Sequence, residues 1–278
     1  MSQASSSHGL QNVESQELDR LLRLNQFLNQ ECLDRIGLRA GDRVLEVGSG
    51  LGIFAREMAR VVGGDPQLVC VEQSEDRIYR SLELAASAQE EHLIDMRQGD
   101  LYSLPLQEEE WGTFDVVHCR FVLSRVRDPQ RAVESMVRAL KPGGRMILVD
   151  DDHDLVRLWP VMPAVDELWR ALVRGAIDSD RDPYIGRKIS TMMHVSGLSP
   201  TRSGYLFGGG SSGSDGWEFV AVNMVDVLRG ARSSILDSTA ITGDLFDEVI
   251  ESLVSWSRRP DSSLWYPICW AEAMRSRD

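Results

Sequence analysis

Three glycines at alternate positions mark the segment of this chain best suited to hold a ligand. The run from Val44 to Gly52 reads VLEVGSGLG, an apolar stretch that leads through a turn into helical sequence. Glycine at positions 48, 50 and 52 lets the backbone turn sharply and leaves no side chains against a bound molecule. A steric turn alone would also need glycine. Ile53 stands where a dinucleotide fingerprint requires its third glycine, so a pyrophosphate cradle is disfavoured.

Two carboxylates follow the next two predicted strands. Glu72 ends the strand after the glycine turn, where a carboxylate can accept hydrogen bonds from both hydroxyls of a ribose. Asp100 follows the third strand, where it can accept from an adenine amino group while Leu101 offers an apolar wall. Any one of these acids could be a surface or capping residue. With Glu46 in the first strand, acids at three successive strands favour an adenosine site.

The glycine turn lies within an alternation of strand and helix patterns. Five strands are predicted, at Arg43–Val47, Leu68–Val71, Ile94–Gln98, Phe114–Cys119 and Arg145–Val149. The helices between them are predicted at Ile53–Val62, Ser74–Gln89 and Pro129–Leu140. Right-handed crossovers join such units into a parallel sheet covered on both faces. The predicted fold class is α/β, a Rossmann-like doubly wound, mostly parallel sheet that binds ligands at the carboxyl ends of its strands.

Helical additions surround this core. We expect a disordered tail at 1–13, an N-terminal helix at 14–40, the ligand-binding core at 41–153, a lid or substrate insertion at 154–184, and the rest of the sheet with inserted helices at 185–278. The last part is predicted to hold helices at Gly186–Val195, Phe219–Leu228 and Leu245–Trp256, a strand at Thr201–Phe207, a loop at Gly208–Gly216 and a closing strand at Leu264–Trp270.

Composition limits the partners. The chain has 43 acidic against 30 basic residues, and its formal net charge of −13 repels a polyanionic backbone, so we expect no nucleic acid partner. No apolar run approaches the roughly 20 residues that cross a bilayer, and the first residues do not read as a signal peptide. The four cysteines lack paired spacing, which favours reduced thiols in a cytoplasmic protein. We expect a small-molecule partner and no membrane, and leave a homodimer open.

Five short motifs of the core occur together in one order. They are VLEVGSGLG from Val44, VCVEQS from Val69, the Gly99-Asp100 pair, FDVVH from Phe114 and KPGGR from Lys141. In this order they resemble class I S-adenosylmethionine-dependent methyltransferases, in the branch that includes ubiquinone, menaquinone and natural-product methyltransferases. The similarity covers about residues 40–150. It implies that the cofactor is S-adenosylmethionine and that a methyl group is transferred to an oxygen, nitrogen or carbon atom of a small molecule. Secondary metabolism is one context in which such an enzyme would act.

The resemblance also implies which residues surround the cofactor. Glu46 would orient the glycine loop or meet the methionine amino group, Glu72 would hold the ribose, and Asp100 would bind the adenine amino group. Residues flanking the adenine, and backbone near His118, Cys119 and Arg120 beside the sulfonium and the methionine moiety, complete the set. The cofactor-binding residues implied are Glu46, Gly48, Ser49, Gly50, Gly52, Glu72, Gln73, Asp100, Leu101, Cys119 and Arg120.

Catalysis by such an enzyme depends mainly on geometry. Methyl transfer from a sulfonium is an in-line displacement, so a dry pocket that holds donor and acceptor collinear supplies most of the acceleration. A base is needed when the acceptor is a hydroxyl or a carbon acid. His153, in the run DDDH after the fifth strand, is the first candidate, followed by His118 and Asp151; a structural role is the alternative for either histidine. The aspartates at 150–152 could bind Mg²⁺, but adjacent side chains of a strand diverge, and we expect no metal.

Three other functions stay open. An enzyme on the same scaffold could bind S-adenosylmethionine and catalyse a different reaction such as a cyclisation, because a fold does not fix the chemistry. A noncatalytic regulatory subunit could bind a partner through Leu155–Ala176 or the C-terminal helices. A nicotinamide oxidoreductase comes last, because the third glycine of its fingerprint is missing.

Overall fold

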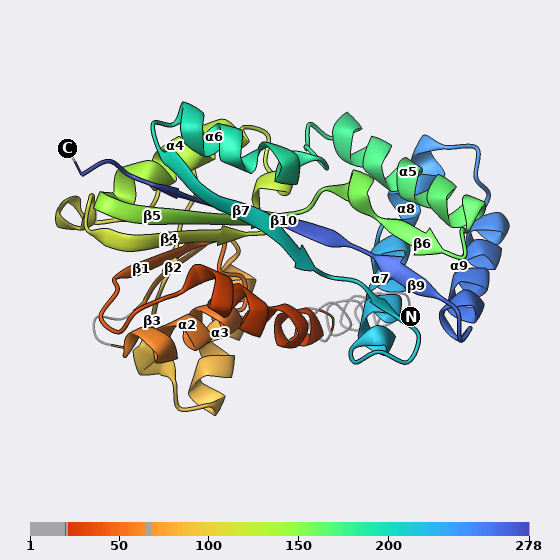
Figure 1. The fold of residues 1–278 in the computed structure, drawn as a ribbon, viewed down its shortest axis with the longest axis horizontal. Helices are drawn as coiled ribbons and strands as arrows, with labels where there is room; N and C mark the ends of the chain where they lie inside the picture. The colour runs from red at the N-terminus through yellow and green to blue at the C-terminus, as the bar shows by residue number, and fades with distance from the viewer. Residues whose placement is uncertain (1–19, 21, 65–67, 278) are drawn as a thin grey trace, which may run out of the picture. The chain divides into compact units, whose positions relative to one another are not determined.

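The computed structural model describes residues 20, 22–64 and 68–277, whose helices and strands are drawn in Figure 1. These residues form two compact units. The sheet unit comprises Glu31–Val156, Ala176–Phe207 and the stretch from Tyr266 to the C-terminus. The helical unit comprises Arg157–Gly175, Gly208–Trp265 and the stretch that ends at Gln30. The tail predicted at 1–13 and the start of the N-terminal helix lie outside the described residues.

The sheet unit is built on a seven-stranded sheet of order β3-β2-β1-β4-β5-β10-β7. Its strands are β1 (Val44–Val47), β2 (Leu68–Glu72), β3 (Ile94–Gln98), β4 (Phe114–Arg120), β5 (Leu140–Asp150), β7 (Ser199–Phe207) and β10 (Pro267–Met274). The strands from β3 to β5 are parallel, and β10 is antiparallel to both β5 and β7. This arrangement confirms the predicted doubly wound α/β fold. It also brings the ends of β1, β2 and β4 to one edge, where the glycine turn lies.

Helices cover both faces of this sheet. The helices α2 (Ile53–Val62) and α3 (Glu75–Ser87) lie on one face, and α4 (Pro129–Ala139) and α6 (Ile189–Val195) on the other (Figure 1). Local sequence explains where they begin, since Ser74 Oγ accepts from Arg77 N at 3.4 Å at the start of α3. Short 3₁₀ turns fill several connections, at η1 (Glu91–Leu93), η2 (Glu108–Glu110), η3 (Leu123–Arg125), η4 (His153–Leu155) and η5 (Ile185–Lys188).

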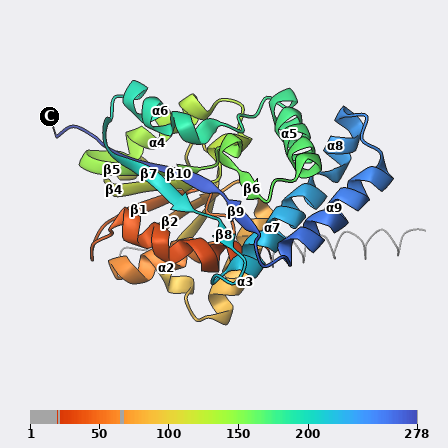
Figure 2. The same cartoon turned by 45° about the vertical axis from the view of Figure 1, so that its right-hand side comes forward.

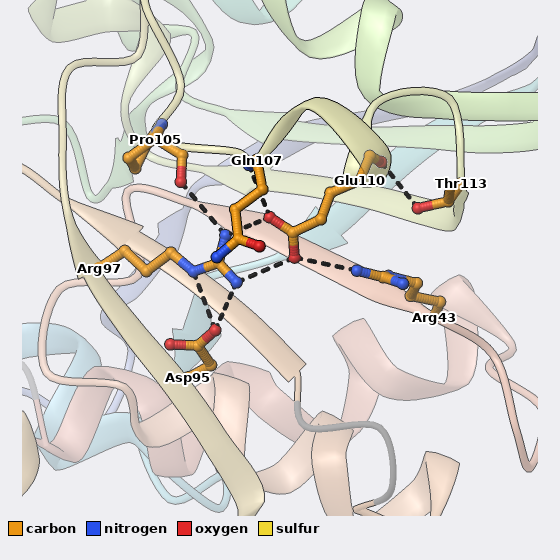
Figure 3. Close-up of polar contacts among 7 residues, drawn as sticks. All are labelled: Arg43, Asp95, Arg97, Pro105, Gln107, Glu110 and Thr113. Carbon is orange, nitrogen blue, oxygen red and sulfur yellow. Dashed lines mark hydrogen bonds and ion pairs between the residues drawn. The ribbon is translucent and has the colours of Figure 1, made fainter.

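An ion-pair network holds the connection between β3 and β4, whose one short helical turn is η2. Arg97 on β3 donates to both carboxylate oxygens of Glu110, at 2.5 and 2.9 Å, and to Asp95 (Figure 3). Arg43, just before β1, donates to the same carboxylate at 3.0 Å. The hydrogen bonds from Arg97 lower the pKa of Glu110 to about 2, and Glu110 in turn raises the pKa of Arg97. The network therefore fixes the segment that carries Asp100 across the sheet.

A second buried carboxylate anchors the end of the N-terminal helix, which spans residues 22–36. Glu272 on β10 accepts from Arg145 at 2.9 Å and from Arg202 at 2.7 Å. Arg145 also donates to the carbonyl of Ile36 at 2.8 Å, in the last turn of that helix, where a cation is favoured by the helix dipole. Gly37 then leaves the helix with φ of 58°.

The helical unit contains the segments added to the core. It holds the start of α5 (Pro163–Asp178), α7 (Trp217–Gly230), α8 (Arg232–Ser238) and α9 (Gly243–Ser257), and a three-stranded antiparallel sheet of β6 (Arg157–Trp159), β9 (Ser263–Trp265) and β8 (Gly210–Ser211). Figure 2 shows α7 and α9 side by side. The ring centroids of Trp217 on α7 and Trp256 on α9 lie 5.7 Å apart. Among the helices described, none is long and apolar enough to cross a membrane.

Two predictions for the C-terminal part differ from the structure, and one helix was not predicted. The strand expected at Leu264–Trp270 is two strands, β9 and β10, which pair in different sheets on either side of Tyr266. An apolar run predicts that the backbone is extended, but it does not predict that the chain leaves one sheet and pairs with strands of another. The loop expected at Gly208–Gly216 contains the short strand β8, and α8 was not predicted because its sequence, RSSILDS, has a single buried residue, Ile235.

Candidate functional site

The glycine loop between β1 and α2 requires glycine at each predicted position. Gly48, Gly50 and Gly52 have φ of 77°, 56° and 63°, in the left-handed region that other residues rarely adopt. A Cβ on Gly48 would lie 2.3 Å from a methyl of Val122, whereas a Cβ on Gly50 would meet no atom within 4 Å. The backbone of Gly50 is therefore bare and open, as a ligand loop needs. Ser49 donates from its backbone N to Val71 O at 3.1 Å.

Glu72 ties this loop to the end of β2. Its buried carboxylate accepts from Gly50 N at 2.9 Å through one oxygen, and from the backbone N of Gln73 and Ser74, both at 3.0 Å, through the other. The oxygen that accepts from Gly50 N has room for a further donor, whereas the other oxygen already accepts two hydrogen bonds. The carboxylate predicted to bind the ribose is therefore in direct hydrogen-bond contact with the glycine loop.

Asp100 lies at the neighbouring strand end. Gly99 N donates to the carbonyl of Glu72 at 3.1 Å, which brings the end of β3 beside the end of β2. The Asp100 side chain is exposed and accepts from Tyr102 N at 2.9 Å. Leu101 is half-buried and packs against the core of the sheet unit. Glu72 and Asp100 thus share one edge of the sheet.

Glu46 and His118 face each other across β1 and β4 inside the sheet unit. They are register partners, and Glu46 Oε1 lies 3.4 Å from His118 Nδ1. His118 is fully buried, with the ring of Phe54 at 5.2 Å between centroids. Burial lowers the pKa of His118, and the charge of Arg120 lowers it further. Glu46 has the opposite effect and raises this pKa. His118 is therefore neutral at physiological pH and contacts Glu46 rather than the surface.

The end of β4 carries the other residues implied beside the sulfonium. Cys119 is buried, and burial raises the pKa of its thiol well above the usual range. The guanidinium of Arg120 lies 4.2 Å from the ring centroid of Phe54 and donates to Cys32 Sγ at 3.3 Å. The next residue, Phe121, has φ of 58°, an unusual backbone for a side chain of this size. Nothing in the sequence marks this strained position, which lies at the edge where ligands bind.

The three aspartates after β5 have three different sets of partners. Asp150 accepts from Ser124 N at 3.2 Å and from Asp151 N at 2.9 Å. Burial raises the pKa of Asp150 to about 6, and the charge of Asp151 adds to this effect. Asp152 accepts hydrogen bonds from two nitrogens of the Arg187 guanidinium, Nε at 2.5 Å and Nη2 at 2.7 Å. Within the described part of the chain, no three His, Cys, Asp or Glu side chains are grouped as metal ligands.

Asp151 and Tyr266 form a contact that sequence reasoning missed. Tyr266 donates from its hydroxyl to Asp151 Oδ1 at 2.6 Å, across more than 100 residues of chain. Burial raises the pKa of Tyr266 well above its usual value, so the phenol keeps its proton. His153 is half-buried in η4, where its backbone N donates to Pro183 O at 3.0 Å. The end of β5 therefore holds a carboxylate with a phenol donor and, two residues on, a histidine.

Comparison with protein families finds a match for the core. The family described as a methyltransferase domain matches residues 45–148, from β1 to β5. The ubiquinone/menaquinone biosynthesis C-methyltransferase UbiE of Pseudomonas putida is 32% identical over 127 residues, which cover 46% of this chain and 48% of that protein. The chain spans about half the length of the curated relatives it matches first.

Solved structures resemble nearly the whole chain. The YcgJ protein of Bacillus subtilis gives a TM-score of 0.58 with 18% identity and covers 90% of this chain and 98% of that one. The [4+2]-cyclase SpnF gives a TM-score of 0.56 with 16% identity and covers 90% of this chain and 81% of that one. At these identities the likeness concerns the fold alone.

Proposed function

We propose that the chain, whose residues 45–148 match a methyltransferase domain, is a class I S-adenosylmethionine-dependent methyltransferase that methylates a small-molecule acceptor. The proposal covers the whole chain, whereas the family match covers the core. The relatives named as quinone-biosynthesis C-methyltransferases make a small cyclic or aromatic acceptor a reasonable first choice. The formal net charge of −13 supports a small molecule over nucleic acid.

One contact carries the proposal, the hydrogen bond from Gly50 N to Glu72 at 2.9 Å. A single S-adenosylmethionine needs a bare backbone for its amino-acid end and a carboxylate for its ribose, a few ångströms apart. Gly50 provides open backbone, and Glu72 provides a buried acceptor with one lone pair to spare, on the oxygen that accepts from Gly50 N. The two features meet at the carboxyl ends of β1 and β2, the position at which sheets of this kind bind ligands.

Glu46 fits the ammonium group of the cofactor. Its Oε2 is buried and has no hydrogen-bond partner among the described residues. A buried carboxylate oxygen without a donor is costly, and a cationic ligand would satisfy it. In this assignment Glu46 binds the methionine ammonium, beside the loop formed by Gly48, Ser49, Gly50 and Gly52.

The adenine end would be held from β2 and β3. Gln73 and Leu101 follow these strands on either side of the position proposed for the base, and Leu101 is already packed against core residues. Asp100 is exposed, so its second oxygen can accept from the exocyclic amino group. The adenine-binding roles of Gln73, Asp100 and Leu101 are supported by the position of the ends of β2 and β3, which lie side by side at one edge of the sheet.

At the reacting end, the bound sulfonium supplies an electrophilic methyl group. We assign the backbone at Cys119 and Arg120 to hold the donor in line, and the buried neighbours of β4 to exclude water. For an acceptor that must lose a proton, Asp151 is a candidate base, because the Tyr266 hydroxyl at 2.6 Å fixes its carboxylate. His153 remains a second candidate for the same step.

Binding and transfer can be tested in turn. Calorimetry should detect S-adenosylmethionine and its demethylated product, and no binding of NAD. The protein is then incubated with methyl-labelled cofactor and a panel of phenols, quinols and amines. We expect label to appear on one of these three classes of acceptor. Binding of NAD in place of S-adenosylmethionine would refute the proposal.

A second function is kept because this scaffold also occurs in a cyclase, SpnF. An enzyme of that kind would bind S-adenosylmethionine without consuming it. Cofactor binding, conversion of a supplied substrate and retention of label on the cofactor would identify it.

A further inference from the structure

The pair of Glu46 and His118 is the least expected feature of the sheet unit. Both side chains are buried, with Glu46 4% and His118 0% exposed, in the parallel register of β1 and β4. Three of their polar atoms, Glu46 Oε2, His118 Nδ1 and His118 Nε2, have no hydrogen-bond partner among the described residues. Buried polar groups are nearly always satisfied, so orphans gathered at one place require an explanation.

The ionisable groups known to interact with the pair are one arginine and three thiols. Besides Glu46, the charged group that acts on the His118 pKa is Arg120 on β4, which lowers it. Glu46 also acts on three buried thiols whose pKa values are raised mainly by burial, so they stay protonated; they are Cys32, Cys70 and Cys119. A carboxylate in such surroundings interacts strongly with any cation brought next to it.

His118 cannot serve as a base for an acceptor from this position, because its ring is fully buried against Phe54 and Glu46. A neutral imidazole that carries its proton on Nδ1 directs that proton at Glu46 Oε1, 3.4 Å away. This contact fixes one carboxylate oxygen and leaves Oε2 free, on the strand that leads into the glycine loop.

We propose that His118 is a positioning residue, which orients Glu46 so that Oε2 receives the ammonium group of S-adenosylmethionine. The inference rests on the proposed function, since it assumes that the glycine loop binds this cofactor. In this inference His118 helps to recognise the amino-acid end of the cofactor, and it has no direct role in binding or deprotonating the acceptor.

The test compares two ligands that differ only at that end. S-adenosylhomocysteine carries the amino-acid group, and 5′-methylthioadenosine lacks it. Calorimetry on His118→Leu should show an affinity for S-adenosylhomocysteine reduced about tenfold, with 5′-methylthioadenosine unchanged within about twofold, because the 3.4 Å contact that orients the charged Glu46 is lost. His118→Asn keeps a donor near the Nδ1 position and should stay within about threefold of the wild type for both ligands.

A double variant tests whether His118 acts through Glu46. Glu46→Gln should lose the preference for S-adenosylhomocysteine, and His118→Leu added to it should cause no further loss. Equal weakening of both ligands in His118→Leu would mean a merely structural role and would overturn the inference, as would unchanged binding of S-adenosylhomocysteine. If the wild type binds neither ligand, the proposed function itself fails. Thermal unfolding of each variant establishes that it is folded.

Discussion

At the scale of single residues, the glycines of the loop differ in what surrounds them. Gly48 is closed off by Val122 and Gly52 by Ser81, whose Oγ would lie 2.3 Å from an added Cβ. Gly50 faces open space. Packing within the protein therefore explains two of the three glycines, and the third is left for a ligand to explain.

Gly50→Ala should separate cofactor binding from folding. Its φ of 56° makes alanine cost about 1 kcal/mol of stability, but no atom lies within 4 Å to clash. The added methyl would occupy the proposed ligand space, so we expect affinity for S-adenosylmethionine to fall at least about tenfold, by calorimetry. Gly41→Ala is the matched control, because Gly41 has φ of 83° and open surroundings in the turn before β1. Equal affinity in the two variants would place the cofactor elsewhere.

Glu72→Ala should weaken cofactor binding more severely. The change removes the proposed ribose acceptor and three hydrogen bonds to backbone N, from Gly50, Gln73 and Ser74. We expect a loss of about a hundredfold in affinity, since buried charge-assisted bonds each contribute about 1.5–3 kcal/mol. Glu75→Ala, an exposed acid in the first turn of α3, serves as control, and His153→Ala should also keep its cofactor affinity. Wild-type affinity in Glu72→Ala would remove the ribose assignment.

At the scale of elements, the predictable features are those encoded locally. The apolar runs of the first five strands and caps such as Ser74 indicated the parallel core closely, because burial and capping act within a few residues. Features that depend on strand pairing were not foreseeable. The contact of His118 with Glu46 follows from the register of β1 and β4, and that of Asp151 with Tyr266 from the return of β10 beside β5.

The segment between β3 and β4 gives a prediction about pH. The pKa of Glu110 is lowered from 4.5 to about 2 by Arg97, so its stabilising effect is complete above pH 4.5 and is lost as the pH falls toward 2. Glu110→Gln should therefore lower the free energy of unfolding by about 3 kcal/mol at pH 7, and by about half as much at pH 3. Denaturant unfolding at both pH values measures the difference. Glu109→Gln, an exposed neighbour, should change little, and a deficit independent of pH would exclude the ion pair as its source.

At the scale of the whole molecule, the proposed cofactor residues and candidate bases all belong to the sheet unit. They lie between Glu46 and His153, and Tyr266 belongs to the same unit. The helical unit holds five of the seven tryptophans, at positions 159, 169, 217, 256 and 265, whereas Trp111 and Trp270 lie in the sheet unit. Intrinsic fluorescence therefore reports mainly on the helical unit, and far-ultraviolet circular dichroism on both.

This distribution allows the location of the cofactor to be tested by thermal unfolding of the full chain. A ligand that binds only the native sheet unit stabilises it by about 2.7 kcal/mol at a hundred times its Kd, which raises the midpoint of a domain of this size by about 5–10 °C. With S-adenosylhomocysteine we expect the circular dichroism transition of the sheet unit to rise by this amount. If the two units unfold separately, the fluorescence transition should rise less, because most tryptophans lie in the unit without proposed cofactor residues. A larger rise by fluorescence than by circular dichroism would mean that the helical unit holds the cofactor, contrary to the assignment of Glu46, Glu72 and the glycine loop.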